Sequence, residues 1–399
     1  MRLSFLPLLL IWSLWPSTGS PAETELIRDP HFQNGFTLLQ AKPGQRVPYG
    51  ALAGLNPAAE PAWDLAQWSS RFPLETTHSN HSFGNLAWTN EGKAVRIGKP
   101  GTPEADLALR VNAHREYELQ ARQMKDPWTH LLVQQNLENP PALPDLAACH
   151  FQMEAKLNHS HLHRTEDYSP DRHAAQFLVY LTIANRNPRS PGFGQYLWFG
   201  IPVYDDRHAV VPAYQAEDFG DTKMFIYTVS SDAFSARSSH DGEWIKLDRD
   251  ILPLIHKGLN DAWAKGFLPG SRDPADYQIT GIFIGWEVPG LFDVEAQIRN
   301  LSLKTVSKPK SALVDLVTEH PELLLTSNQA WGQLARFQAK AQALQASTGA
   351  ITEEIGILRR DIQELKTDPR RAADHARLHY LYAKPDETLT IIHRESSPP

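Results

Sequence analysis

Apolar and polar residues alternate with a period of two in several segments of the first three quarters of the chain. This alternation predicts β-strands whose apolar side faces a core. Gly and Pro turns, rather than helices, separate most of these segments, which favours an antiparallel sandwich over βαβ units. One helix is expected over 251–263 from its helical apolar spacing. The clearest strand candidates span 151–158, 177–183, 196–201, 223–229, 281–288 and 294–303.

The beginning of this region suggests a hairpin. An apolar segment near Leu26 is followed by a turn containing Asn34-Gly35 and then by a second apolar segment over 36–39. Asn-Gly is a strong hairpin signal, so we expect the two segments to pair. Residues 41–103 are rich in Gly, Pro, Asn and Ser and are expected to form long loops between short strands.

The first and last strand candidates carry a family resemblance. The segment from Asp29-Pro30 through Phe32 to Gly35-Phe36, together with the strand Asp293–Leu303, resembles the jelly-roll carbohydrate-binding modules of the galactose-binding-like kind. The resemblance implies that the first and last strands lie side by side. The expected fold class is therefore mainly β, an antiparallel jelly-roll β-sandwich over 23–305, followed by a C-terminal α-helical coiled-coil segment.

A helical pattern replaces the strand pattern after about residue 310. Apolar residues alternate in steps of three and four over 330–365, as in a heptad seam. We expect a linker and short helix over 306–322, a coiled-coil helix over 323–367, and a short helix, strand and tail over 368–399. The helix either mediates homo-oligomerisation or packs within its own chain. Positions a and d are Leu334, Ala341, Thr348, Ile355, Ile362 and Phe337, Leu344, Ile351, Leu358, Leu365, respectively.

The tail carries a second resemblance. The segments Leu365–Pro369, Ala376–Leu378 and Lys384–Glu387 are similar to the end of the septum formation initiator family of bacterial cell-division coiled-coil proteins. The resemblance covers 330–393. It implies a coiled-coil protein of the cell envelope and an envelope protein as a partner.

Composition and charge narrow the location and the partners. The chain of 399 residues has a net charge of −7 and a pI near 6.2, which argues against nucleic acid as a partner because phosphate contacts need a basic face. Residues 1–22 contain an apolar run followed by small residues, which predicts a signal peptide, with an uncleaved anchor as the alternative. The single cysteine, Cys149, excludes an intramolecular disulfide. We expect a periplasmic or secreted protein.

Aromatic and charged side chains alternate with the apolar residues of the predicted strands. Rings stack on the CH faces of sugars and charged groups bond to hydroxyls, so such a face predicts glycan binding. The alternative is a solvated face whose rings are covered by loops. Our main hypothesis is an exported, non-catalytic carbohydrate-binding protein. The expected ligand-binding residues are Glu154, Lys156, Tyr180, Tyr196, Trp198, Tyr227 and Glu287.

Two other functions remain open. Glu154 and Glu287 are candidates for a glycosidase carboxylate pair, which would make the protein a polysaccharide-degrading enzyme, a glycoside hydrolase or lyase on a jelly-roll fold. Alternatively, the protein is a structural factor of the cell envelope or of division that acts through the coiled coil. A fold alone does not decide between these alternatives.

Metal binding is a further candidate property. His159, His161 and His163 alternate along a strand and share one face, where three imidazoles suit zinc or copper. The alternative is a solvent-exposed strand end. Asp29 and Asp293 lie at the ends of strands expected to be neighbours, which allows a structural calcium ion. No other cofactor is expected.

Overall fold

The computed structural model describes residues 23–308, apart from 41–45, 77–78, 83–84, 103–104 and 220–221. The side chains of 79–82 are also not described. The signal peptide expected over 1–22, the linker beyond residue 308, and the coiled coil and tail expected over 323–399 lie outside the described residues.

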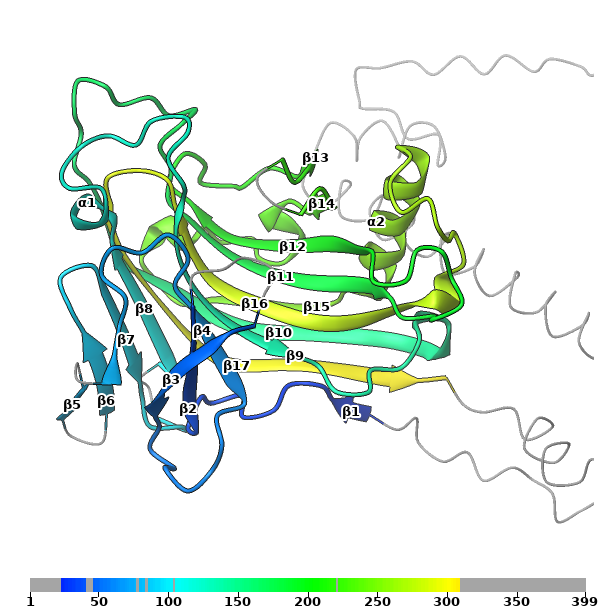
Figure 1. The fold of residues 1–399 in the computed structure, drawn as a ribbon. Coiled ribbons are helices and arrows are strands. Elements are labelled where there is room, and N and C mark those ends of the chain that lie inside the picture. The colour runs from blue at the N-terminus through cyan, green and yellow to red at the C-terminus, as the bar shows by residue number, and fades with distance from the viewer. Residues whose placement is uncertain are drawn as a thin grey trace, which may run out of the picture. The chain divides into compact units, whose positions relative to one another are not determined.

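The described residues form two sheets packed as a jelly-roll sandwich (Figure 1). Sheet A has the order β15-β10-β17-β8-β7-β6-β5, and β1 pairs with β17. Its strands are β1 (Glu23–Glu25), β5 (Ser79–Ser82), β6 (Asn85–Thr89), β7 (Lys93–Ile97), β8 (Leu107–Asn112), β10 (Leu146–Leu162), β15 (Ile245–Asp250) and β17 (Phe292–Ser307).

Sheet B has the order β13-β14-β12-β11-β16-β9-β4-β2-β3. Its strands are β2 (Gly35–Leu39), β3 (Pro48–Ala53), β4 (Trp63–Ala66), β9 (Thr129–Asn136), β11 (Gln176–Asn185), β12 (Tyr196–Asp205), β13 (Tyr214–Glu217), β14 (Phe225–Thr228) and β16 (Tyr277–Val288). The two α-helices among the described residues are α1 (Ala113–Glu116) and α2 (Leu252–Ala264).

The strand pattern of the sequence is confirmed in outline. Each of the clearest candidates became a strand, and the expected helix is α2. The first and last strands pair as expected, with Glu23 opposite Val306. Two pairs, β2–β4 and β12–β14, are parallel, so the sandwich is mostly rather than entirely antiparallel.

The expected N-terminal hairpin is wrong. β1 lies in sheet A, whereas the Asn34-Gly35 turn leads into β2, which pairs with β3 and β4 in sheet B. Asp29 fixes this crossing, because its carboxylate accepts hydrogen bonds from the backbone N–H groups of Gln33 and Asn34, both at 2.9 Å. The turn residues were recognised correctly, but the turn connects two sheets rather than two neighbouring strands.

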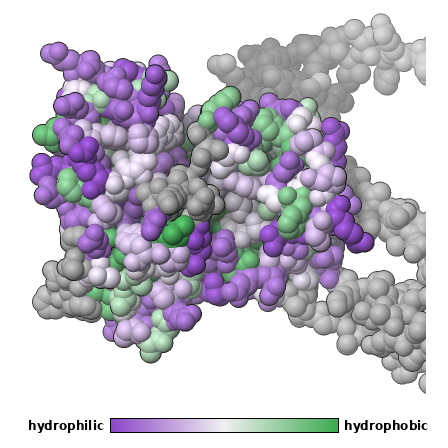
Figure 2. All heavy atoms as spheres, viewed as in Figure 1, coloured by the Kyte–Doolittle hydropathy of each residue, from purple (hydrophilic) through white to green (hydrophobic). Residues whose placement is uncertain are grey.

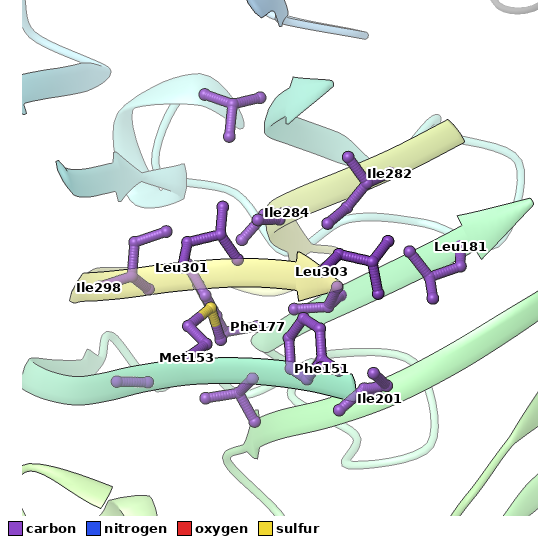
Figure 3. Packing of buried hydrophobic residues seen from close by; sticks show 14 of the residues in the cluster. Phe151, Met153, Phe177, Leu181, Ile201, Ile282, Ile284, Ile298, Leu301 and Leu303 are labelled. Carbon is purple, nitrogen blue, oxygen red and sulfur yellow. The ribbon is translucent and has the colours of Figure 1, made fainter. Parts of the chain in front are cut away.

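The core lies between the two sheets. Apolar side chains of β10 and β17 point toward those of β11, β12 and β16 (Figure 3). Phe151, Met153, Phe177 and Leu303 are at most 1% exposed. Burying each such side chain contributes about 1.5–3 kcal/mol. The alternation that predicted the strands therefore also identified the core face.

Helix α2 closes one edge of the sandwich. It contacts β10 of sheet A and both β12 and β14 of sheet B. Gly258 allows this approach, because an added Cβ would lie 2.9 Å from the ring of Tyr227 and 3.1 Å from Leu197. Tyr227 is therefore an inward-facing residue beneath α2.

One ion pair is fully buried. Lys93 at the start of β7 pairs with Glu116 of α1, and neither side chain is exposed. Burial lowers the pKa of Lys93 against the attraction of Glu116. Glu116 also accepts hydrogen bonds from the backbone N–H of Arg71 and from the hydroxyl of Ser70. The pair thus fixes the loop before β5 to sheet A.

The surface carries no broad apolar area on the side visible in Figure 2, where hydrophobic residues are scattered among hydrophilic ones in the described part. Isolated exposed apolar residues are ordinary in folded proteins. Within the described part of the chain, no helix is long and apolar enough to cross a membrane. Cys149 is buried, and burial raises the pKa of its thiol to about 12.

Candidate functional site

The outer face of sheet A is a ladder of paired charges. Arg299 holds Glu154 with two bonds of 2.7 and 2.8 Å, and Asn300 donates a third bond of 3.0 Å. Arg110 holds Asp293 in the same two-bond geometry. Partial burial raises the pKa of Glu154, but the bonds from Arg299 and Asn300 outweigh it and hold the pKa below its ordinary value. These groups are occupied with one another.

The outer face of sheet B carries a cluster of rings. Trp198 of β12 contacts Tyr196 on its own strand, with the ring centroids 5.1 Å apart. It also contacts Tyr180 of β11 at 5.7 Å and Phe283 of β16 at 5.1 Å. Every contact is edge-to-face, the arrangement that the ring quadrupoles favour. The Trp198 indole N–H donates to the hydroxyl of Thr222 at 3.2 Å. The rings are half-buried and form a platform on the sheet.

Glu287 lies on the same face. It follows Phe283 on β16 by four residues, so both side chains point outward while Ile284 and Trp286 point into the core. The Glu287 side chain is 18% exposed. Burial, with a smaller contribution from the negative charge of Asp218, raises the pKa of Glu287 to about 7. A carboxyl group on this platform thus titrates near neutral pH rather than in acid.

Asp218 follows β13 and is the second carboxylate of this site. It accepts hydrogen bonds from the hydroxyl of Thr222 at 2.5 Å and from the Thr222 backbone N–H at 3.3 Å. Its charge raises the pKa values of Glu287 and Tyr180 and opposes the lowering of the pKa of His130. Asp218 therefore interacts electrostatically with three groups on this face of sheet B.

Tyr180 lies next to the carboxyl groups. Burial raises the pKa of its hydroxyl, and the charge of Glu287 adds to the increase. Gly200 on the neighbouring strand leaves room for the ring, because an added Cβ would lie 2.9 Å from Tyr180 Cε1 and 2.4 Å from Thr228 Oγ1. Tyr180 is consequently a neutral hydrogen-bonding group at the floor of the site.

Exposed aromatic side chains surround this platform. Tyr214 of β13 is 58% exposed and Phe219 is 73% exposed, and both are close in sequence to Asp218. Trp128, next to β9, is 41% exposed. We call Tyr180, Tyr196, Trp198, Phe283, Glu287 and Asp218 the sheet B site, and Trp128, Tyr214 and Phe219 its exposed aromatic residues.

The structure divides the expected sugar-binding residues into three groups. Tyr180, Tyr196, Trp198 and Glu287 come together on the outer face of sheet B, as expected. Glu154 and Lys156 lie on β10, on the outer face of sheet A. Tyr227 is 5% exposed and faces inward, so it is not part of the platform. Strand alternation identified the outer face for all of these residues except Tyr227, but it does not tell which sheet a strand joins.

Glu154 and Glu287 therefore do not form a carboxylate pair. Their strands belong to different sheets, and both side chains point away from the core between them. Packed sheets lie ~10 Å apart before side chains are added. The partner that the structure brings to Glu287 is Asp218, which lies in a loop where no sequence pattern marks it. His130 and Phe283, in contrast, occupy outward positions of β9 and β16.

The three histidines lie together at the end of β10. The register shift between Leu157 and His159 precedes them, and His159 and His161 lie opposite Glu295 and Asp293 of β17 with no further shift, so they share a face as expected. His159 turns to Asp293, with Nε2 3.2 Å from Oδ1. His163 stacks on His114 at 3.9 Å and contacts His161 edge-to-face at 4.5 Å. Among the described residues, no group of three or more His, Cys, Asp and Glu side chains is placed to hold a metal ion.

Asp29 and Asp293 likewise do not form a calcium site. β1 pairs with β17 at residues 304–306, eleven residues beyond Asp293. Asp29 follows Glu25 by four residues, toward Asp293 in this antiparallel pair, which leaves about seven residues, or roughly 23 Å of strand at ~3.3 Å per residue, between the two. Each carboxylate also has its own partners, the backbone of the turn for Asp29 and Arg110 with His159 for Asp293. The expected pairing of the first and last strands is confirmed. β1, however, pairs with the C-terminal end of β17, whereas Asp293 lies at its N-terminal end.

Two small cavities lie elsewhere. One of about 240 Å³ opens on sheet A and is lined by Asn85, Arg96, Gly98, Ala105, Ala108 and Gln297. The other, of about 180 Å³, lies near β2 and β3 and is lined by Leu39, Gln40, Tyr49, Gln67, Ser70 and Pro73. Neither contains Glu287. The perturbed carboxyl group and the rings, rather than a deep cavity, therefore identify the candidate site.

Comparisons with known proteins give structural likeness only. No family model matches the chain. No curated protein matches it either. A family 12 xyloglucanase from Bacillus licheniformis is 8% identical with a TM-score of 0.35, over 58% of this chain and 99% of that one.

Two further structures are similar to the same degree. A thermostable cellulase derived from Cel12A of Rhodothermus marinus is 11% identical with a TM-score of 0.32, over 61% of this chain and 99% of that one. The family 11 xylanase from Neocallimastix patriciarum is 12% identical with a TM-score of 0.32, over 57% and 95%. Scores this low carry no argument about activity, which has to come from the site itself.

Proposed function

We propose that this protein hydrolyses glycosidic bonds in a polysaccharide, with Glu287 as the general acid and Asp218 as the second carboxylate. The observation that supports this proposal is the position of Glu287, partly buried beside aromatic rings and near Asp218. Its pKa is raised to about 7 next to the charge of Asp218, on a sheet face lined with aromatic rings. A carboxyl group that keeps its proton at neutral pH is suited to protonate a leaving group.

The chemistry needs two carboxyl groups in different protonation states. One donates a proton to the glycosidic oxygen, and the other acts as a nucleophile or activates a water molecule. Burial favours the neutral form of Glu287. Asp218 accepts two hydrogen bonds from Thr222, which fix the orientation of its carboxylate. We therefore assign the acid role to Glu287 and the second role to Asp218.

Substrate binding rests on the rings. Sugar CH faces stack on aromatic side chains, and the half-buried platform of Tyr180, Trp198 and Phe283 offers such a surface beside Glu287. The exposed aromatic residues provide further contacts on either side for a chain longer than one sugar. We therefore propose an extended glycan as the substrate.

The cellular setting is also a proposal. The pattern of residues 1–22 supports export to the periplasm or the medium, where polysaccharides occur. The heptad seam over 330–365 supports homo-oligomerisation or docking to an envelope protein. Both expectations come from residues outside the described part of the chain.

The test is release of reducing ends from a panel of neutral and acidic polysaccharides by the purified full chain. The Glu287→Gln variant should lose about 10²- to 10⁴-fold in kcat, the usual contribution of a general acid. Glu154→Gln is the matched control, because Glu154 lies on the other sheet, and it should retain the parent rate. Equal rates for the parent and Glu287→Gln would overturn the assignment of the general acid.

Binding without hydrolysis is the second candidate function. The hydrogen bonds that fix Asp218 to Thr222 favour it, because a carboxylate held in this way also serves as a rigid acceptor for sugar hydroxyls. The same panel separates the two candidates when calorimetry is added. Polysaccharide binding with no reducing ends from the parent would support a binding protein and exclude the hydrolase.

A further inference from the structure

His130 lies beside Glu287 on the outer face of sheet B. It lies on β9 directly opposite Glu287 in the antiparallel register of β9 and β16. Its ring nitrogen Nε2 is 3.8 Å from Glu287 Oε1, and its side chain is 17% exposed. The ring packs edge-to-face on Trp68 at 5.4 Å, and its backbone N–H donates to the Trp68 carbonyl at 3.0 Å. The imidazole is therefore held in place from two sides.

The second ring nitrogen defines the tautomer. Nδ1 of His130 is 2.8 Å from the backbone carbonyl oxygen of Trp128. A carbonyl oxygen only accepts hydrogen bonds, so Nδ1 carries the hydrogen. In a neutral imidazole, the other nitrogen is then a bare acceptor. The lone pair of Nε2 consequently faces the Glu287 carboxyl group.

We propose that His130 is a positioning residue that keeps the catalytic proton on Glu287, by presenting Nε2 as an acceptor to the protonated carboxyl group. This inference rests on the proposed function of Glu287 as the general acid. The separation of 3.8 Å exceeds a hydrogen bond, and hydrogen bonds of catalytic groups are often long before substrate binds and shorten afterwards.

Burial, more than charge, opposes the protonation of His130. Burial is the largest effect and lowers the pKa of His130 to about 4, the bond to the Trp128 carbonyl opposes it, and the positive charge of Lys93 adds to the lowering. Asp218 acts in the opposite direction on both groups, since it favours a proton on His130 and on Glu287. The proton of the pair therefore resides on Glu287 between about pH 4 and pH 7.

The consequence is a preference for the acid form of Glu287. A protonated carboxyl group donates to Nε2, whereas an ionised carboxylate faces a lone pair. Tyr180, which also lies in the site, stays neutral and adds no charge. His130 thereby extends to higher pH the range in which Glu287 is able to donate a proton.

The first test uses the unaltered full chain with ¹⁵N-labelled histidine and ¹³C-labelled glutamate. NMR spectra should show His130 as the neutral tautomer protonated at Nδ1 between about pH 5 and pH 8, and its Nε2 shift should change when Glu287 titrates. The Glu287→Gln variant assigns the carboxyl signal. An imidazolium ring at pH 6, or a hydrogen on Nε2 of the neutral ring, would overturn the proposal.

The second test is the His130→Gln variant. The amide bonds to either form of Glu287, as acceptor to the acid or as donor to the carboxylate, so it removes the preference for the acid. The pKa of Glu287 should fall by about one unit, which moves the basic limb of the pH–rate profile the same distance with KM unchanged. His159→Gln, on the other sheet, is the control and should leave both unchanged.

The two readouts separate this inference from the proposed function. A lowered Glu287 pKa in His130→Gln, measured by NMR, supports the role of His130 even if the parent protein releases no reducing ends, in which case only the hydrolase proposal fails. An unchanged pKa in a folded His130→Gln variant overturns the role of His130, whatever the activity.

Discussion

The two outer faces of the sandwich carry similar residue types but place them in different electrostatic environments. On sheet A, Glu154 lies between Arg299 and Asn300, and its pKa is lowered. On sheet B, Glu287 lies among rings with the carboxylate Asp218 nearby, and its pKa is raised. A carboxylate with cationic partners is a structural group, whereas one without charge compensation is available for proton transfer.

The comparison separates charge pairing from function. On both faces, the outward residues alternate along each strand with residues buried in the shared core. Both faces carry acidic and aromatic residues, so the types of residue do not distinguish them. Trp244, which directly precedes β15 of sheet A, is covered by the guanidinium of Arg299 at 4.1 Å. On sheet B, the rings contact one another and leave an open platform. The partner of each group, rather than its type, decides what it is able to do.

The largest expected effect comes from removing the second carboxylate. Asp218→Asn keeps the acceptor for Thr222 but removes the charge, so hydrolysis should fall about 10²-fold or more. The pKa of Glu287 should fall as well, because the charge of Asp218 helps to raise it. Initial rates against pH measure both effects.

The control is Asp248→Asn, which removes an exposed carboxylate that pairs with Lys246 on sheet A. It should leave the rate and its pH dependence unchanged. Equal loss of activity in both variants would show that the two faces do not differ in the way described.

The second prediction concerns stability against pH. The pKa of Glu287 is raised from its ordinary 4.5 to about 7, so the native state binds more protons than the unfolded state in this interval, and its contribution to stability is lost as pH rises through it. The loss amounts to at most about 3 kcal/mol. Glu287→Gln should abolish this decline in chemical unfolding experiments.

Glu154 should have the opposite sign. Its folded pKa is lowered, so its contribution is present above the unfolded value and is lost as pH falls through the folded value. Glu154→Gln should therefore weaken the protein at neutral pH and converge with the parent in acid. Parallel pH curves for the two variants would contradict the contrast between the faces.

The third prediction compares two tryptophans. Trp198→Ala removes the central ring of the platform and should weaken polysaccharide binding by about 1.5 kcal/mol, roughly tenfold. Trp244→Ala removes the ring that stacks on Arg299 on sheet A and should leave affinity unchanged. Calorimetry with the polysaccharide chosen from the panel measures both, and a greater loss in Trp244→Ala would place the glycan on sheet A.

The smallest effect is expected for a single ion pair of sheet A. Arg96 bonds to Glu295 at 2.8 Å and is 41% exposed. Because exposed pairs are screened by solvent, Arg96→Met should cost at most about 1 kcal/mol in unfolding free energy. Hydrolysis should be unaffected, and a loss comparable with that of Asp218→Asn would assign sheet A a functional role.

The sequence by itself determined the strands and their faces. Period-two alternation marks which side of β10, β11, β12 and β16 enters the core, because apolar burial drives that choice locally. It therefore placed Tyr180, Trp198 and Glu287 on an outer face. It also placed α2, whose apolar spacing is helical.

Only the tertiary structure decided which strands share a sheet, and therefore which outward side chains lie on the same face. Assignment of a strand to a sheet depends on pairing between segments far apart in the chain, so Glu154 and Glu287 separated although their patterns are alike. A loop brought Asp218 to Glu287, and a loop has no periodic signal. The chemistry of Glu287 depends on burial and on nearby charges, and these exist only once the chain has folded.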